Sequence, residues 1–407
     1  MTADPLRGQY EAYPYPTRRP GDPDFARPRT AVNDLRTIGH YLFRGRRDFT
    51  RPFRALVAGG GTGDATVHLG YQLAELGAPA EIVHLDLSAA SIEVARRRAA
   101  AAGLGNVRFV QRSLLDLPIP ELGAFDYINC SGVLHHLENP AAGARALAAA
   151  LKPDGGLSLM LYGELGRIGI YHVQDMMRLL RRDGDDLPGL IGLTRTLLDT
   201  LPSSNWLKRR HPKQPKRPDA EIVDMFLHVR DRPYRVRDVL ELLAAAGLRL
   251  VSFIPPVRYD PLDSLKDAEL RRRVEALPLA DRCAFAELLH GGPPRHILFA
   301  VAAGRADRTV AEPGDPTAVP VLIEPVALPA SAGAPLILRA GAAEVGSKLN
   351  PLGYRILSAI DGRRTIDEVF HHVAGTTRPT VTRTAFDATF GNVYRLLNDA
   401  HVLMLTH

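Results

Sequence analysis

The first residues with an evident chemical use are the glycines of the loop Gly59-Gly60-Gly61-Thr62-Gly63. The loop follows an apolar run, 54–58, and precedes a helical pattern at 64–76. Glycine lets the backbone turn sharply and lets a ligand approach it closely, and the helix that follows offers free N–H groups. The spacing is G-x-G-x-G, because Asp64 stands where a dinucleotide motif has its third glycine. We therefore predict that Gly59, Gly61 and Gly63 contact a ligand segment without phosphates.

Asp86 ends the next apolar strand pattern, 81–86. In nucleotide-binding sheets, a carboxylate at this point accepts hydrogen bonds from both ribose hydroxyls. The alternative is a surface residue that caps the helix expected at 88–102, for which Ser88 is a natural N-cap. We expect Asp86 to bind ribose, with Leu87 beside it.

Two further segments follow the third and fourth strand patterns: 112–116 (RSLLD) and 129–137 (NCSGVLHHL). The carboxyl edge of a parallel sheet is where α/β proteins bind ligands. Ser113 or Asp116 can accept a hydrogen bond from an adenine amino group. The predicted contacts in these segments are Ser113, Leu114, Asp116, Cys130 and Ser131.

Alternating strand and helix patterns must position these residues, and they predict an α/β fold with helices on both faces of a sheet. The expected strands are 54–58, 81–86, 107–110, 125–130, 156–162, 248–253 and 296–302. The predicted domains are an N-terminal arm and lid at 1–53, a sheet domain at 54–302 with insertions at 163–232 and 255–294, a linker at 303–335 and a small unit at 336–407.

Together the motifs resemble those of class I S-adenosylmethionine (SAM) dependent methyltransferases. They are most similar to a bacterial group with motifs much like AGGGTG, LDLS, CSGVLHHLENP and LKPDGGLSLMLYGELGR. The resemblance covers about 54–167, with further similarity at 10–18 and 220–254. It implies a Rossmann-like sheet of seven strands, SAM as the cofactor and methyl transfer as the activity. Relatives often carry an acidic residue in place of Val57 and usually carry Asp in place of Ser113.

His135 and His136 are the candidates for a catalytic base, since histidine titrates near neutral pH. Methyl transfer needs a base only if the acceptor must lose a proton. The alternative is that both side chains shape the loop beneath the cofactor.

Tyr13, Tyr15 and Arg18 of the N-terminal arm can form a lid, in which Arg18 meets the SAM carboxylate as a fork. The alternative is an arm that packs on the surface. Glu164 and Arg167 follow the fifth strand, and a structural ion pair is the favoured role for them.

The unit at 336–407 resembles small winged-helix domains on the run 349–369, which is similar to the peptide-recognition domains of peptide-modification pathways. The resemblance implies an α+β fold that holds a leader peptide or a protein partner against an exposed strand. A structural or dimerising role is the alternative. The expected i,i+4 pairs of Arg383 with Asp387 and of Arg395 with Asp399 disfavour DNA binding.

Composition limits the remaining choices. The chain has 407 residues, 45% of them hydrophobic and 24% charged, with a net charge of +6. The absence of a long apolar run argues against a membrane span and, with no signal-peptide core, leads us to expect a cytoplasmic protein. Cys130 and Cys283 suggest neither a disulfide framework nor a cysteine zinc site, and no metal site is predicted.

Three functions remain open. The first is a SAM-dependent methyltransferase acting on a small molecule or on a peptide or protein. The second is an RNA methyltransferase that uses the basic segment 208–217, although nucleic acid is the less favoured partner because a solvated, mobile loop is the favoured explanation of this segment. The third is a non-catalytic SAM-binding regulator whose small unit mediates interactions. A homodimer is possible in each case.

Overall fold

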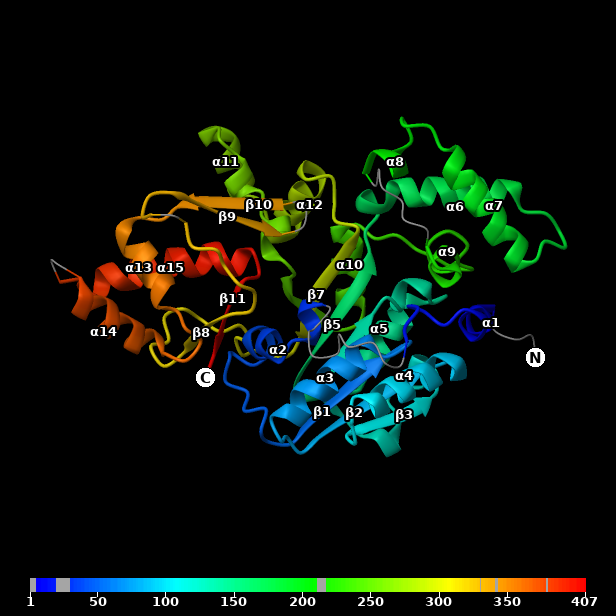
Figure 1. Ribbon diagram of the computed structural model, residues 1–407, viewed down its shortest axis with the longest axis horizontal. Helices are drawn as coiled ribbons and strands as arrows, with labels where there is room; N and C mark the ends of the chain where they lie inside the picture. The colour runs from blue at the N-terminus through cyan, green and yellow to red at the C-terminus, as the bar shows by residue number, and fades with distance from the viewer. Residues whose placement is uncertain (1–4, 20–29, 211–216, 330, 341–342, 378–379) are drawn as a thin grey trace.

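The computed structural model describes residues 5–19, 30–210, 217–329, 331–340, 343–377 and 380–407. Its centre is a seven-stranded sheet in the order β3-β2-β1-β4-β5-β7-β6, in which only β7 runs antiparallel to its neighbours (Figure 1). The strands are β1 Phe53–Ala58, β2 Ala80–Asp86, β3 Val107–Gln111, β4 Phe125–Ser131, β5 Leu151–Tyr162, β6 Leu248–Phe253 and β7 Arg295–Ala302. The predicted seven-stranded α/β fold is therefore confirmed.

Helices cover both faces of the sheet because strand side chains alternate between two cores. On β1, Ala55 and Val57 face the core formed with α2 and α3, whereas Leu56 and Ala58 face the core formed with α5 and α10. The helices of this domain are α2 Leu35–Leu42, α3 Asp64–Glu75, α4 Ala89–Ala101, α5 Pro140–Ala149 and α10 Val236–Ala245. As predicted, the Ser88 side chain caps α4 by accepting from the Ser91 N–H.

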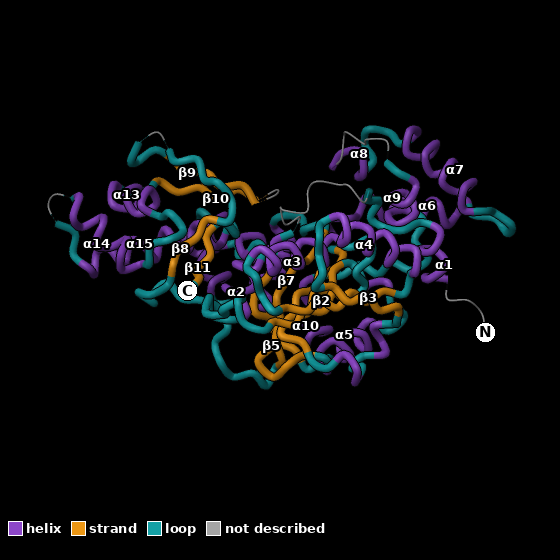
Figure 2. The backbone as a smooth tube through the Cα atoms, turned by 60° about the horizontal axis from the view of Figure 1, so that its bottom comes forward, coloured by secondary structure: helices purple, strands orange, loops and turns teal. Residues whose placement is uncertain are grey.

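Each of the two predicted insertions forms helices of its own. The first contains α6 Ile168–Leu180, α7 Leu187–Thr200, α8 Trp206–Arg210 and α9 Asp219–Phe226, which share a separate apolar core. The second contains α11 Ala268–Glu275 and α12 Leu279–Leu289. Figures 1 and 2 show α6–α9 grouped at one end of the molecule, close to the N-terminal helix α1 Pro5–Ala12.

The C-terminal unit lies at the opposite end of the molecule (Figure 2). It combines the hairpin β9 Pro335–Ala340 and β10 Ala343–Lys348 with α13 Pro351–Ala359, α14 Ile366–Thr376 and α15 Arg383–Asp399. The final strand β11, Leu403–Thr406, pairs with β8, Val319–Leu322, which lies within the stretch expected to be a linker. The expected α+β composition is thus present, and the Thr365 side chain caps α14 by accepting from the Glu368 N–H.

His40 of α2 ties the C-terminal unit to the sheet domain. Its ring is fully buried; Nδ1 accepts from the Leu405 N–H at 3.0 Å, and Nε2 lies 3.2 Å from the Tyr394 hydroxyl. Burial lowers the pKa of His40 to about 3, so the ring is neutral at physiological pH. None of the helices in the described ranges is long and apolar enough to span a bilayer.

Candidate functional site

The glycine loop leaves the end of β1 and turns into α3. Gly59, Gly61 and Gly63 have φ angles of +70°, +52° and +93°, a region that side-chain-bearing residues rarely adopt. The turn directs the Gly61 N–H toward the end of the neighbouring strand β2, where its acceptor is the Asp86 carboxylate at 2.8 Å. Sequence reasoning therefore placed these glycines and Asp86 at one sheet edge, and the structure brings them into contact.

Both oxygens of Asp86 take part in this arrangement. Oδ2 accepts from Gly61, and Oδ1 accepts from the Ser88 N–H at 2.9 Å. Burial raises the pKa of Asp86, partly offset by these backbone donors. The carboxylate is thus held in a fixed position at the carboxyl edge of the sheet, where a ribose would lie.

The predicted adenine-side residues lie at the end of β3. Ser113 is half-buried, and its hydroxyl accepts from the Leu115 N–H at 3.1 Å to cap a short 3-10 helix. Asp116 is exposed and Leu114 is buried, while the Leu87 carbonyl accepts from the Gln111 side chain at 3.2 Å. These residues therefore line one edge near Asp86, and their contacts with a nucleoside stay a prediction.

At the end of β4, the predicted residues divide into two kinds. Cys130 is buried in the apolar core beneath the sheet, and burial raises the pKa of its thiol to about 12, so only its backbone is available to a cofactor. Ser131 is half-buried at the strand end. His135 and His136 follow on a short 3-10 helix, Leu134–His136, and both rings are buried.

The N-terminal arm packs across the glycine loop, and its role as a lid stays a prediction. The Thr62 hydroxyl donates to the Pro16 carbonyl at 2.7 Å, and the Tyr15 carbonyl lies where a Cβ on Gly61 would fall. Glu11 accepts from two N–H groups at the start of α4. Tyr13, however, packs against the core of the first insertion.

Arg18 forms a two-pronged ion pair with Asp64 at the start of α3, at 2.8 and 2.7 Å. The fork that was expected to meet the SAM carboxylate therefore fastens the arm to α3, and the cofactor contact stays a prediction. Burial would raise the pKa of Asp64, but Arg18 and Arg98 hold it below its usual value.

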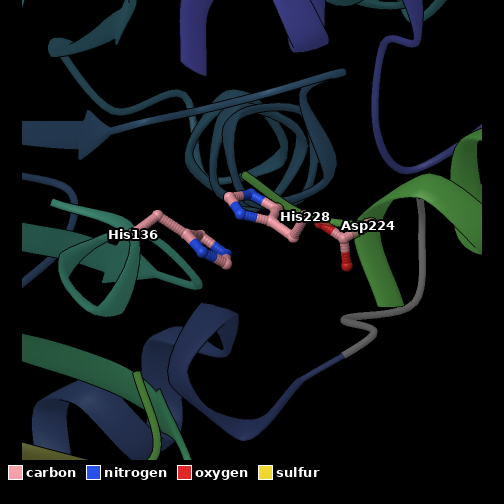
Figure 3. A group of neighbouring side chains, drawn as sticks. All are labelled: His136, Asp224 and His228. Atoms are coloured by element: carbon pink, nitrogen blue, oxygen red, sulfur yellow. The ribbon is translucent and has the colours of Figure 1, made fainter. Parts of the chain in front are cut away.

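A polar cluster that sequence reasoning missed lies between this arm and the first insertion (Figure 3). His136, Asp224 and His228 converge so that one ligand-type atom from each lies within 4.8 Å of the others. Tyr10 and Tyr162 complete the cluster, since both hydroxyls donate to Asp224, at 3.4 and 3.1 Å. No sequence spacing could have joined these residues, because they come from α1, the loop after β4, the end of β5 and the α9 region.

Two ion pairs lie around the cluster. Arg167 pairs with the buried Asp231 at 3.4 Å, and its guanidinium lies 3.5 Å from the centroid of the Tyr162 ring. Glu164 pairs with Arg235 at 2.6 Å. Both residues therefore have the structural role that was favoured for them, with partners from the 231–235 segment.

Two cavities in the described chain lie elsewhere. One, of about 400 Å³, lies between β10, α15 and the second insertion, and another, of about 410 Å³, lies beside α13 and α14. Neither contains a predicted site residue, so the chemistry is assigned from the side chains at the sheet edge and not from cavity size.

Comparisons with known proteins show what this chain is similar to. Residues 56–157 match the family model described as a methyltransferase domain. A Synechococcus sp. protein named uncharacterized protein syc1184_c is 35% identical over 244 residues, which are 58% of this chain and 57% of that one. A ubiquinone biosynthesis O-methyltransferase of Xanthomonas axonopodis pv. citri is 35% identical over 91 residues, 22% of this chain and 37% of that one. The chain thus spans less than two thirds of each of these relatives.

Solved structures share the fold over most of the chain. PKMT2 from Rickettsia typhi has a TM-score of 0.67 at 15% identity, covering 93% of this chain and 76% of that one. The same protein in complex with AdoHcy has a TM-score of 0.66 at 17% identity. At this identity the likeness shows the fold alone. Residues 56–157 thus match a methyltransferase domain, and the fold is that of the Rickettsia typhi protein.

Proposed function

We propose that this protein transfers a methyl group from SAM to a small-molecule, peptide or protein acceptor. The observation that carries the proposal is the contact between the glycine loop and the end of β2. In this contact the Gly61 N–H donates to the Asp86 carboxylate at 2.8 Å. The sulfonium of SAM activates its own methyl group, so the protein needs only to orient the two reactants and exclude water. The buried polar cluster beside the arm lies where the acceptor would approach.

In this proposal Gly59, Gly61 and Gly63 adjoin the methionine part of SAM, and Asp86 binds the ribose. Ser113 and Asp116 adjoin the adenine, with Leu87, Leu114, Cys130 and Ser131 as neighbouring contacts. Tyr13 and Arg18 contribute to the site by holding the N-terminal arm in position.

We expect Asp86→Ala to weaken SAM binding by roughly 10- to 100-fold or more, because hydrogen bonds to a charged group are worth about 1.5–3 kcal/mol each. Isothermal titration calorimetry with SAM measures the change. Glu93→Ala on the exposed surface of α4 is the control, since Glu93 pairs only with arginines of its own helix among the contacts described. An unchanged dissociation constant for Asp86→Ala would refute the site assignment.

A second candidate function is peptide recognition by the C-terminal unit. Each strand of the hairpin β9–β10 pairs only with the other among the described strands, so the hairpin has an open edge at which an extended peptide can add a strand. We expect synthetic peptides encoded by short reading frames beside the gene to slow amide hydrogen exchange at 335–340 or 343–348. Protection confined to the first insertion would place the peptide elsewhere and contradict this role.

The RNA alternative receives less support from the described part of the basic segment. Lys208, Arg209 and Arg210 contact the Asp199 carbonyl, the Trp206 ring and the Gly291 carbonyl, respectively. Residues 211–216 lie outside the described chain.

The non-catalytic alternative makes a different prediction. Labelled product S-adenosylhomocysteine, formed only with an acceptor, would exclude it.

A further inference from the structure

The backbone of Arg230 gives two stacked histidines opposite hydrogen-bonding roles. Its carbonyl lies 2.7 Å from His136 Nδ1, which must therefore carry the hydrogen and donate it. Its N–H donates to His228 Nδ1 at 3.0 Å, so that nitrogen is bare and the hydrogen of His228 is on Nε2. The two rings stack with centroids 3.7 Å apart and an interplanar angle of 18°. His136 Nε2 is consequently a lone-pair acceptor.

The hydrogen on His228 Nε2 begins a continuous chain of donors. His228 Nε2 lies 3.1 Å from the Tyr10 oxygen, and the Tyr10 hydroxyl donates onward to Asp224 Oδ1. Tyr162 donates to the other oxygen of Asp224. Each of these groups has a partner, whereas His136 Nε2 is buried without a hydrogen-bond partner in the described chain. Within this cluster, the acceptor without a partner therefore belongs to His136, which lies on the short 3-10 helix after β4.

The ligand-type atoms of His136, Asp224 and His228 form a triangle, and one polar atom at its centre would be in contact with all three. Sides of at most 4.8 Å place its centre within about 2.8 Å of each corner, which is hydrogen-bond distance. A zinc ion in the triangle would bind His228 through Nε2, and this nitrogen would need a lone pair. Nδ1 of that ring already accepts from Arg230 and Nε2 carries the hydrogen, so metal binding would require an unfavourable imidazolate. A group with a hydrogen to give fits the triangle better than a cation.

The triangle is connected to the proposed cofactor site through Tyr10. The Tyr10 carbonyl accepts from the Ser88 hydroxyl at 3.1 Å, two residues after Asp86. The backbone of the 228–232 segment is also joined to the end of β4, since the Arg232 N–H donates to the His135 carbonyl at 3.1 Å. The sheet edge that carries the cofactor residues thus also fixes the position of the triangle.

We infer that His136 is the catalytic base for a methyl acceptor that carries a hydroxyl or an N–H group, with His228, Tyr10 and Asp224 as positioning residues. The inference rests on the proposed methyltransferase function. In the reaction a lone pair of the acceptor oxygen or nitrogen forms a bond to the methyl carbon. The carbon–sulfur bond breaks, and its electron pair stays on sulfur. The acceptor proton passes to Nε2 of His136, and the Asp224 carboxylate offsets the positive charge.

The surrounding charges support these roles. Burial lowers the pKa of His136 to about 4, so the ring is neutral near pH 7 and the lone pair on Nε2 is present. Burial raises the pKa of Asp224 to about 7, opposed by the Tyr162 hydroxyl and by Arg167. The groups that face Asp224 are Tyr10 and Tyr15 from the arm, Tyr162 from β5, Arg167 before α6, and His228 and Asp231 after α9. Activity should therefore fall as the pH drops below about 7, because Asp224 loses its charge.

The test uses the full-length protein, methyl-labelled SAM and an extract of the source cells, counting label in small molecules and in macromolecules. Removing a general base costs about 10²–10⁴-fold, so we expect His136→Ala to lower the rate at least 100-fold with SAM affinity within about threefold of wild type. We expect Asp224→Asn to abolish the decline in rate between pH 7 and pH 6, above the range in which acid unfolding is expected. His371→Ala, on exposed helix α14, is the control and should leave both unchanged. A wild-type rate in His136→Ala would overturn the inference but leave the proposed function intact. The proposed function is tested separately by SAM binding to Asp86→Ala.

A second measurement needs no acceptor. Nitrogen NMR of labelled histidines should show hydrogen on Nδ1 of His136 and on Nε2 of His228. The two tautomers are opposite because one ring donates to the Arg230 carbonyl and the other accepts from the Arg230 N–H. Zn²⁺ should not bind stoichiometrically. Like tautomers in both rings, or one tightly bound Zn²⁺ that is lost in His228→Ala, would overturn the assignment even if the extract contained no acceptor.

Discussion

Acidification from pH 7 to pH 5 is expected to unfold this protein, because burial lowers the pKa of six of its histidines. Burial lowers the pKa of His84, His136 and His401 to about 4, of His40 to about 3 and of His228 to about 2. The pKa of His135 also lies well below its ordinary value because of burial. In the unfolded chain all six would titrate near 6.5.

The sign of the effect follows from proton binding. Below pH 6.5 the unfolded chain binds protons that the folded chain does not, so stability is lost as the pH falls toward each folded pKa. Each histidine costs about 1.4 kcal/mol per pH unit, or roughly 9 kcal/mol at pH 5 for the five whose folded pKa is about 4 or lower. Burial raises the pKa of Asp224 to about 7 and that of Asp399 to about 6. Because these two groups bind protons in the folded chain, they offset about 4 kcal/mol of the lost stability at pH 5. The net loss in the free energy of unfolding at pH 5 is similar to the whole stability of a typical domain.

Circular dichroism during urea unfolding at pH 7, 6 and 5 measures this loss. His40→Gln should reduce the slope of stability against pH below 6.5 by about 1.4 kcal/mol per unit, while lowering stability at pH 7 through its lost contacts with Leu405 and Tyr394. The exposed His371→Gln should leave the slope unchanged. Equal urea midpoints at pH 7 and pH 5 would contradict the prediction.

Gly60→Ala is expected to weaken SAM binding at least tenfold and to destabilise the fold, although Gly60 was not among the predicted contacts. A Cβ at this position would lie 2.2 Å from the His84 ring. That ring cannot move aside easily, because it is fully buried in β2 and its Nδ1 lies 2.8 Å from the Thr66 hydroxyl. Overpacking of this kind costs about 1–3 kcal/mol, and relief requires a shift of the glycine loop away from Asp86.

Calorimetry with SAM and thermal unfolding measure both effects. Gly105→Ala is the matched control, since it is a loop glycine with nothing within 4 Å of an added Cβ, and it should have no effect on SAM affinity. His84→Ser removes the obstructing ring, so the double variant Gly60→Ala/His84→Ser should bind SAM more tightly than Gly60→Ala alone. Wild-type affinity in Gly60→Ala would show that the loop tolerates the methyl group.

The cofactor side of the site could be anticipated from the sequence because its residues belong to consecutive strand ends. Gly61 and Asp86 end neighbouring parallel strands, so once each strand is recognised their meeting at 2.8 Å follows from the sheet. The same reasoning located His135 and His136 after β4. The fork of Arg18 was less predictable, because a guanidinium binds whichever carboxylate the arm brings near, and this carboxylate is Asp64.

The sequence by itself determined the sheet, its two helical faces and the edge that holds the cofactor. These features depend on local periodicity and on the connection from each strand to the next helix, which neighbouring residues specify. Only the tertiary structure decided what stands opposite that edge. Tyr10 and Asp224 are 214 positions apart, and their contact depends on how an arm and an insertion pack over the sheet. Burial in that packing removes water from His136 and Asp224, which sets their protonation states, and no pattern in the chain encodes that desolvation.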